Sequence, residues 1–279
     1  MTAALLLALA SSLAYGAADF LGGVAARGAH VLRVVVVAAP VSLLVELLLW
    51  PVVGATFDAG AVWWGVASGV ASAAAFALVY RTLAIGPMSV LSPITALVSA
   101  ALPVAVGLTS GESLSAVAVG GMLLAGVAIV IVSGGTDIHG ARPGQKALVL
   151  AFGAGAAIAL QLVCLDQAPD DSGIGPLLVG RAVSSAVVLA AAFVVRSSLG
   201  DTRPSLSASA AAGVLDSLAN FAFLLAVRDG DLAIVAVITA LYPASTVVLA
   251  RAFLAERIGT VQLAGLGLAA VAVSLLAVG

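Results

Sequence analysis

The stretch Ile94-Thr95-Ala96-Leu97 returns, letter for letter, as Ile238-Thr239-Ala240-Leu241, at an offset of 144 residues (238 − 94 = 144). Three further pairs of residues share this offset: Gly86 with Gly230, Glu112 with Glu256, and Gly121 with Gly265. Several matches at one fixed offset indicate an internal duplication. We therefore interpret the chain as two copies of one structural unit.

Both copies lie in unusually apolar sequence. Of the 279 residues, 63% are hydrophobic and 9% are charged, and the mean hydropathy is +1.25. Soluble domains carry about 25% charged residues, so this composition indicates a protein that crosses the lipid bilayer several times. The net charge is −2 and no basic cluster is present, which argues against binding to nucleic acid.

The apolar sequence falls into ten runs, most of about 20 residues, the length that crosses a bilayer core of about 30 Å. Their residues are apolar on every face, without the alternation of barrel strands, so they are predicted to be helices. The expected fold class is an all-α polytopic membrane protein with about ten transmembrane helices. The runs lie near residues 3–24, 31–53, 61–84, 87–108, 114–134, 147–168, 175–196, 207–227, 231–253 and 260–278.

The longest polar stretch, residues 134–146, divides the runs into two sets of five. We predict a first repeat at 1–134, a linker at 135–146 and a second repeat at 147–279. Two identical units with an odd number of spans must enter the membrane from opposite sides, so the repeats are predicted to be inverted. Nine of the eleven Lys and Arg residues flank loops after odd-numbered spans, which predicts that both termini lie outside the cytoplasm.

The paired segments resemble the EamA domain of the drug/metabolite transporter superfamily, and the resemblance covers nearly the whole chain. Arg33 and Arg181 open the second helix of each half, where this family commonly has an arginine. One departure is that Ser99 stands where the second half has Pro243, so the kinks of the fourth and ninth helices are expected to differ. The segments that carry the resemblance are Tyr80-Arg81-Thr82-Leu83-Ala84-Ile85-Gly86-Pro87, Pro93-Ile94-Thr95-Ala96-Leu97, Gly111-Glu112-Ser113-Leu114-Ser115, Gly230, Ile238-Thr239-Ala240-Leu241-Tyr242-Pro243, Leu254-Ala255-Glu256-Arg257-Ile258 and Gly265.

This resemblance implies a ten-helix carrier of small metabolites that uses no ATP. The implied mechanism is alternating access between the halves. The expected cargo is a small organic solute such as an amino acid, moved in the direction of export. The cavity is expected between helices one, three, four, six, eight and nine. We expect a multi-pass protein of the cell (plasma or inner) membrane, for which a monomer is plausible.

Asp216 is the polar residue that points most directly to a site, since it lies near the middle of the eighth span with Asn220 one turn away. A carboxylate at that depth costs about 2.5–3.5 kcal/mol and should face a cavity or a partner. One interpretation is that Asp216, with Asn220 and Tyr242, binds the amine of a solute or carries a coupling proton. The other is a buried polar cluster that holds helices together, and the sequence leaves both open.

Several other charged residues have both a functional and a structural interpretation. Asp19, one turn after Tyr15, is expected to pair with a basic residue at the interface (Arg27, Arg33 or Arg81), with solute binding as the alternative. Glu46 is expected to reach the interface by snorkelling. Arg33 and Arg181 could bind a substrate carboxylate, although anchoring or pairing between helices is favoured.

The remaining motif residues are expected to be structural. Glu112 and Glu256 stand near helix starts and are predicted to cap the fifth and tenth helices, because carboxylates favour the positive end of a helix. Pro243 is expected to bend the ninth helix. Gly86, Pro87 and Gly230 are assigned to the same structural motif.

Two other classes of function agree less well with the sequence than transport does. A membrane-embedded enzyme would need paired acidic or histidine residues at one interface, and the one dense acidic set, around Asp166, Asp170 and Asp171, has no histidine beside it. A passive scaffold would not explain a carboxylate in mid-bilayer. Neither metal-ligand spacing nor a phosphate-binding loop is present, so we expect a transporter that is not an enzyme and has no metal and no cofactor.

Overall fold

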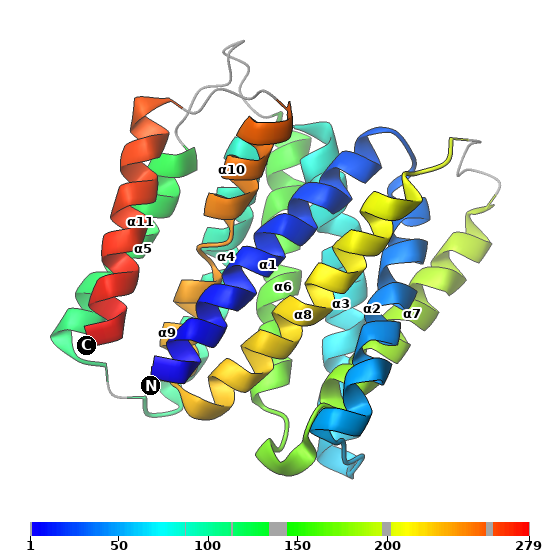
Figure 1. The fold of residues 1–279 in the computed structure, drawn as a ribbon, viewed down its shortest axis with the longest axis horizontal. Coiled ribbons are helices and arrows are strands. Elements are labelled where there is room, and N and C mark those ends of the chain that lie inside the picture. The colour runs from blue at the N-terminus through cyan, green and yellow to red at the C-terminus, as the bar shows by residue number, and fades with distance from the viewer. Residues whose placement is uncertain are drawn as a thin grey trace.

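The structure is a computed structural model that describes residues 2–86, 88–112, 114–133, 144–196, 202–254 and 259–278. Helices dominate the described residues (Figure 1). The first half of the chain forms α1 (Thr2–Arg27), α2 (Val31–Val53), α3 (Ala59–Ile85), α4 (Met88–Thr109) and α5 (Ala116–Ser133). The second half forms α6 (Gln145–Asp166), the short 3₁₀ helix η1 (Asp170–Ser172), α7 (Gly175–Val194), α8 (Leu206–Asp229), α9 (Leu232–Thr239), α10 (Pro243–Leu254) and α11 (Thr260–Val278).

The helices confirm the predicted spans. Within the described residues, eight segments are helical, long and apolar enough to cross a membrane, with α9 and α10 together forming one of them, Leu232–Leu254. Two shorter apolar segments, Ala116–Ile131 in α5 and Leu263–Leu276 in α11, complete the ten. Large apolar side chains point away from the bundle, such as Val52, which is 84% exposed, and Leu48, which is 69% exposed. Such a surface suits contact with lipid rather than with water.

Parts of the predicted boundaries and motif lie outside the described residues. These are Pro87, Glu256 and most of the predicted linker, residues 134–143. On either side of that stretch, α5 ends at Ser133 and α6 begins at Gln145. The division into two repeats with a linker at 135–146 therefore stays a prediction.

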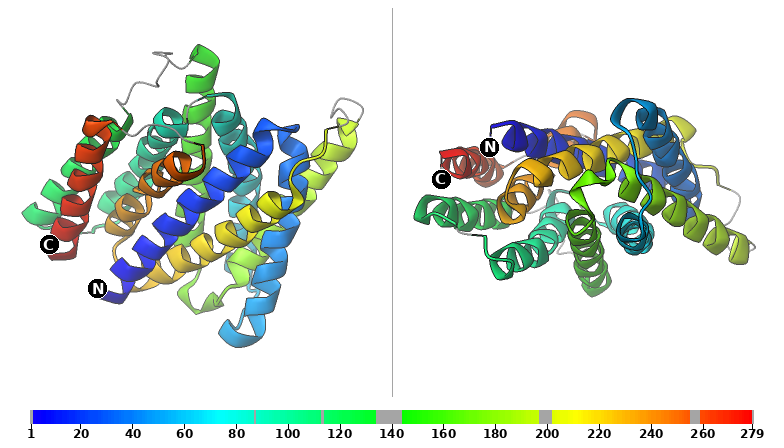
Figure 2. Two further views of the ribbon diagram at one scale, coloured as in Figure 1. Left: turned by 45° about the horizontal axis from the view of Figure 1, so that its top comes forward. Right: turned by 90° about the horizontal axis from the view of Figure 1, so that it is seen from below.

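The helices lie in two layers, each containing helices from both halves of the chain (Figure 2, right). In one layer α1 packs against α8, and α8 packs against α2. In the other layer α6 packs against α3, and α3 packs against α7. Across the layers α2 packs on α7 and α5 on α11. Figure 1 shows the N-terminus of α1 and the C-terminus of α11 at the same end of the bundle, as an even number of crossings requires.

The ninth span is broken near its middle, whereas its counterpart α4 is continuous. α9 ends at Thr239, the turn Ala240-Leu241-Tyr242 follows, and α10 begins at Pro243. A proline has no N–H to donate to the preceding turn of a helix, so the break falls where the sequence predicts a bend. α4 runs through Pro93 and Pro103 without interruption. The expected difference between the fourth and ninth helices is confirmed.

Small residues let the helix backbones approach closely around this break. A Cβ atom on Gly16 of α1 would overlap the Tyr242 carbonyl and the Ser245 side chain. The contact is secured by Thr246, whose Oγ1 donates to the Gly16 carbonyl at 3.0 Å. In α3, a Cβ atom on Gly69 would overlap the Gly180 carbonyl of α7. These glycines pack helices together, as in other small-residue interfaces in membranes.

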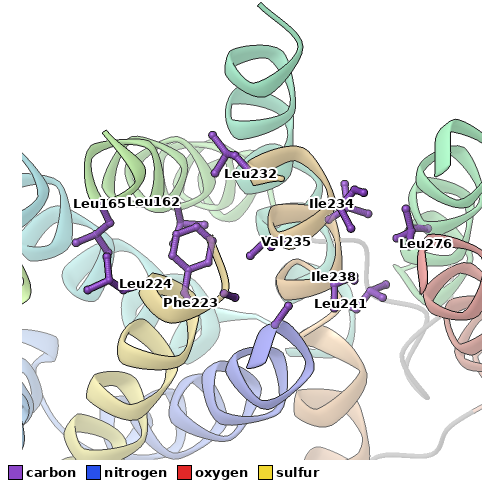
Figure 3. Packing of buried hydrophobic residues seen from close by; sticks show 14 of the residues in the cluster. Leu162, Leu165, Phe223, Leu224, Leu232, Ile234, Val235, Ile238, Leu241 and Leu276 are labelled. Carbon is purple, nitrogen blue, oxygen red and sulfur yellow. The ribbon is translucent and has the colours of Figure 1, made fainter. Parts of the chain in front are cut away.

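α9 is the most enclosed part of the bundle, since every residue from Leu232 to Thr239 is buried. Figure 3 shows how its side chains divide between neighbours: Val235 lies toward Phe223 of α8, and Ile234 lies toward Leu276 of α11. The second half therefore places a short, buried half-helix at the centre of the protein. Its C-terminal end faces the polar residues described below.

Candidate functional site

Arg181 of α7 is the centre of a buried polar cluster and ties together four helices. It is 2% exposed. Its Nε donates to Glu46 Oε1 of α2 at 3.2 Å, and its Nη1 donates to Ser72 Oγ of α3 at 2.6 Å. Its Nη2 forms an ion pair with Asp216 Oδ2 of α8. The guanidinium carbon also lies 5.2 Å from the centre of the Phe76 ring.

Two serines and Asn220 also donate to the two carboxylates, Asn220 from its Nδ2 to Asp216 Oδ2 at 3.4 Å. Ser217 Oγ donates to Glu46 Oε1 at 3.4 Å, and Ser42 Oγ donates to Asp216 Oδ2 at 3.5 Å. The Glu46 side chain is fully buried, so the interpretation that it snorkels to the interface was wrong. Position 46 lies on the inward face of α2, where Arg181 supplies the counter-charge that a carboxylate in a bilayer requires.

Two small cavities lie beside this cluster and share Tyr15 and Asp19 of α1. The first, of about 30 Å³, borders α3, α6 and α8; the second, of about 20 Å³, borders α4, α6 and the end of α9. Their walls come from both halves of the chain and from the six spans that were expected to line a cavity. The first is lined by Tyr15, Asp19, Ser72, Ala75, Phe76, Val79, Tyr80, Ile158, Gln161 and Asp216. The second is lined by Tyr15, Asp19, Ser99, Ile158, Leu162, Thr239, Ala240 and Tyr242.

Asp19 is the residue that the two cavities have in common, with its neighbour Tyr15. The expected pairing with Arg27, Arg33 or Arg81 is not found, because Asp19 forms no ion pair with a basic residue in the described part of the chain. Asp19 lies on the face of α1 that looks into the bundle, three residues after the Gly16 contact. Asp19 was expected at the membrane interface, but in the structure it lines the cavities.

Asp216 fits both interpretations that the sequence left open. It is held by Arg181 as part of the cluster, and its side chain, 14% exposed, also lines the first cavity. Arg181 pairs helices, as favoured, and does not itself line either cavity. Asp216 therefore has both a charged partner and a place beside a cavity.

Asn220 lies one layer behind the cavity wall. Its side-chain oxygen accepts a bond of 2.5 Å from Gln161 Nε2 of α6, and its Nδ2 donates to the Asp216 carbonyl at 2.8 Å. Asn220 itself is fully buried, whereas Gln161 lines the first cavity. Asn220 is therefore positioned to orient Gln161 rather than to touch a solute, contrary to the expectation of direct contact.

Tyr242 lies in the break between α9 and α10 and lines the second cavity, as expected of a cavity residue. Its ring centre is 6.4 Å from that of Tyr15. Beside it Thr239 closes α9, and the Thr239 hydroxyl has no hydrogen-bond partner among the described residues. The break in the ninth span thus places a phenol and a hydroxyl next to Asp19.

The other predicted residues lie away from the cavities. Arg33 is in the first turn of α2 and lines neither of them. Gly86 and Gly230 directly follow the last residues of α3 and α8, as expected of residues that end a helix. Pro243 is the first residue of α10.

Glu112 does not cap the fifth helix as predicted. Its carboxylate instead accepts from the backbone N–H groups of Leu232 at 2.8 Å and Ala233 at 3.0 Å, at the start of α9 in the other half of the chain. The cap near the start of α5 is provided by Ser115, whose Oγ accepts from the Ala118 N–H at 3.0 Å. Glu112 precedes α5 by four residues, too far to cap it, but the turn brings it against α9.

Sequence reasoning missed Gln161, Tyr80 and Phe76 and discounted Glu46. A signal existed for two of them: Gln161 is an amide inside an apolar span, and Glu46 is a charge inside another. The aromatic residues carry no such signal, because rings are common in apolar helices. Among the described residues, no three His, Cys, Asp or Glu side chains are grouped so as to hold a metal ion.

Comparison with known proteins gives the family of the second half of the chain. The sequence profile of the EamA-like transporter family matches residues 145–278. The second half of the chain belongs to the EamA-like transporter family. This half supplies Arg181, Asp216, Gln161 and Tyr242. The resemblance found in the first half rests on the repeated residues quoted above.

A likeness in fold to a solved structure extends over nearly the whole chain. Among the solved structures that match is one described as "Crystal structure of protein", with a TM-score of 0.75 over 99% of this chain and 96% of that chain. The two sequences are 13% identical, so this likeness shows the fold alone. No curated protein matches the sequence. The family match of the second half, together with the apolar helices, identifies the chain as an integral, multi-pass membrane protein of transporter type.

Proposed function

We propose that this protein is a secondary transporter of the cell membrane that exports a small organic solute by alternating access. The class of solute expected from the sequence is that of amino acids and related metabolites. The observation that carries the proposal is the pair of cavities walled by both halves of the chain, with two carboxylates facing them. Polar side chains in a bilayer are costly and are usually kept for a solute or ion pathway.

The arrangement of the helices supports an inverted internal repeat, which alternating access would use. If the halves are equivalent, α1, α2 and α3 correspond to α6, α7 and α8, and a contact in one half should have a counterpart in the other. The contact of α1 with α8 then corresponds to that of α6 with α3, and the contact of α2 with α8 corresponds to that of α7 with α3. All four contacts are present. The contact of α2 with α7 corresponds to itself. In related architectures, transport proceeds by one unit rocking against the other around a site at the interface.

The size of the cavities suits a closed conformation. Volumes of about 30 and 20 Å³ each hold about one water-sized group. A whole metabolite would require the helices around the cavity to separate on one side. The break between α9 and α10 borders the second cavity through Thr239, Ala240 and Tyr242, and a bend at this break would allow such a movement.

Proton coupling is part of the proposal, with Asp216 and Asp19 as the groups that would carry the proton. Both are carboxylates that border the same cavity, and Arg181 is already shared between Asp216 and Glu46. A solute that displaced a proton from this site would couple its movement to the proton gradient. The first repeat has Ser72 where the second has Asp216, so symmetry alone does not require this carboxylate.

The proposal is tested by purifying the full chain into lipid vesicles and measuring the flux of a panel of radiolabelled metabolites, with and without a proton gradient. We expect saturable flux in the absence of ATP, stimulated by a proton gradient. The direction of solute transport is determined with vesicles in which the orientation of the protein is known. Flux that requires ATP hydrolysis by the purified chain, or no saturable flux of any member of a broad panel, would contradict the proposed function.

A further inference from the structure

We propose that the solute is an organic cation and that Asp19 receives its ammonium group. This inference rests on the proposed function and names the class of solute for the same cavity. It predicts that amines without a carboxylate are preferred over amino acids. Charge, aromatic lining and acceptor groups each support it.

The carboxyl groups that border the cavities outnumber the basic groups beside them. Asp19 and Asp216 line them, and no Lys, Arg or His within the described ranges does so. The nearest cation, Arg181, is shared between Glu46 and Asp216 and has a 3% exposed side chain. One positive charge therefore faces three carboxylates, and Asp19 is the one without an ion-pair partner in the part of the chain that the structure describes. A cationic solute would supply that partner.

Aromatic residues line both cavities together with Asp19. Tyr15, Phe76 and Tyr80 line the first cavity, and Tyr15 and Tyr242 line the second. The rings of Phe76 and Tyr80 stand edge to face, with centres 5.6 Å apart. Faces of aromatic rings attract ammonium groups, including those that carry methyl groups, and proteins recognise such cations with several rings at once.

Buried oxygen atoms in the same cavities are available as acceptors. The phenol oxygens of Tyr15 and Tyr80 and the hydroxyl of Thr239 have no hydrogen-bond partner among the described residues. Thr239 is also the last residue of α9, and the carbonyl groups at the end of a helix carry partial negative charge. An ammonium group between Asp19 and Thr239 would donate to the Asp19 carboxylate and to the Thr239 hydroxyl.

Charge disfavours a complete amino acid at this site. The cavities hold about one water-sized group each, enough for an ammonium group. The carboxylate of an amino acid would have to lie beside Asp19 or Asp216 without a basic partner from the described residues. Because an unpaired buried charge is unfavourable, the decarboxylated amine should be preferred to the parent amino acid.

Matched pairs of solutes test the charge requirement. The purified chain in lipid vesicles is given labelled solutes in pairs, each pair being an amine and its carboxylated partner. The pairs are choline and glycine betaine, ethanolamine and serine, putrescine and ornithine, and agmatine and arginine. The inference predicts that the solutes transported are the amines and that the carboxylated partners compete poorly. Transport of the carboxylated partners or of anions in preference to amines would overturn this inference and leave the proposed transporter standing. Absence of saturable flux for every solute would overturn both.

Variants at Asp19 test the assigned residue. Asp19→Asn should weaken binding of the transported amine about 10- to 100-fold, the loss expected when a charge-assisted contact is removed, and Asp19→Glu should retain most of it. The matched control is Asp229→Asn, at the exposed end of α8, which should bind as the wild type does. If Asp19→Asn does not fold, Tyr15→Leu tests the same cavity and should also weaken amine binding. Wild-type affinity for the amine in a folded Asp19→Asn or Tyr15→Leu variant would overturn the assignment.

Discussion

The Arg181 guanidinium and the Asp216 carboxylate form an ion pair inside the bundle, where their side chains are 3% and 14% exposed. The pair has two environments: on one side Arg181 binds Glu46 and Ser72, and on the other Asp216 lines the first cavity. The group that faces the cavity is thus held by the cluster that joins four helices. A change of charge in the cavity would therefore alter the interactions that hold α2, α3 and α7 as well as α8.

Arg181→Met is predicted to destabilise the protein strongly. The substitution keeps an unbranched side chain but leaves Glu46 and Asp216 without a cation, and removing one member of a buried ion pair costs about 3–5 kcal/mol. The apparent melting temperature in detergent should fall markedly, whereas Arg203→Met, at an exposed position, should leave it unchanged. Equal melting temperatures for the two variants would show that the cluster does not hold the helices.

Asp216→Asn is predicted to fold and to alter coupling. Asparagine retains the shape of the side chain and can accept a bond from Arg181, but it cannot release or take up a proton in this role. Exchange of labelled for unlabelled solute should persist in vesicles, while stimulation by a proton gradient should be lost. A variant with the same flux and the same response to the gradient as the wild type would restrict Asp216 to a structural role.

Glu112→Gln is predicted to loosen the start of α9. The Glu112 carboxylate caps the N–H groups of Leu232 and Ala233, and losing a cap costs about 0.5–2 kcal/mol. Amide hydrogen exchange at these two residues should be faster in the variant. Asp231→Asn is the matched control, because the Asp231 side chain forms no capping bond to α9. If both substitutions changed the exchange equally, Glu112 would have no special role.

The two halves are predicted to have opposite orientations in the membrane. Ser110, in the loop before α5, and Thr260, at the start of α11, are both exposed and should lie on opposite sides. In a background of Cys164→Ala, we expect Ser110→Cys to react with an impermeant maleimide in intact cells. Thr260→Cys should react only after permeabilisation. Labelling of both from the same side would rule out the inverted repeat.

Much of the fold could be predicted because local properties decide it. Length and apolar composition define the ten spans, and the missing N–H of Pro243 locates the break in the ninth. The caps were harder to predict: Glu112 stands close to α5 in sequence but caps α9, because the turn that carries it packs against the other half of the chain.

The site could be predicted only in part, because it depends on which helix faces meet. Asp216 and Tyr242 were identified from charge, polarity and depth in the membrane. The pairing of Glu46 with Arg181 spans 135 positions of sequence and requires the packing of α2 on α7, which no local pattern specifies. For the same reason Asp19 was assigned to the interface, since its position in the span did not show that it faces inward.

Filling the first cavity tests the central claim, transport through the space between the halves, most directly. Ala75 of α3 lines this cavity and is 6% exposed, whereas its neighbour Ala74 is exposed on the outer surface of the same helix. We predict that Ala75→Phe abolishes ATP-independent flux of the transported solute in vesicles, while Ala74→Phe, of identical chemistry, retains it. Unchanged flux in a folded Ala75→Phe variant, or equal loss of flux in both variants, would contradict the claim.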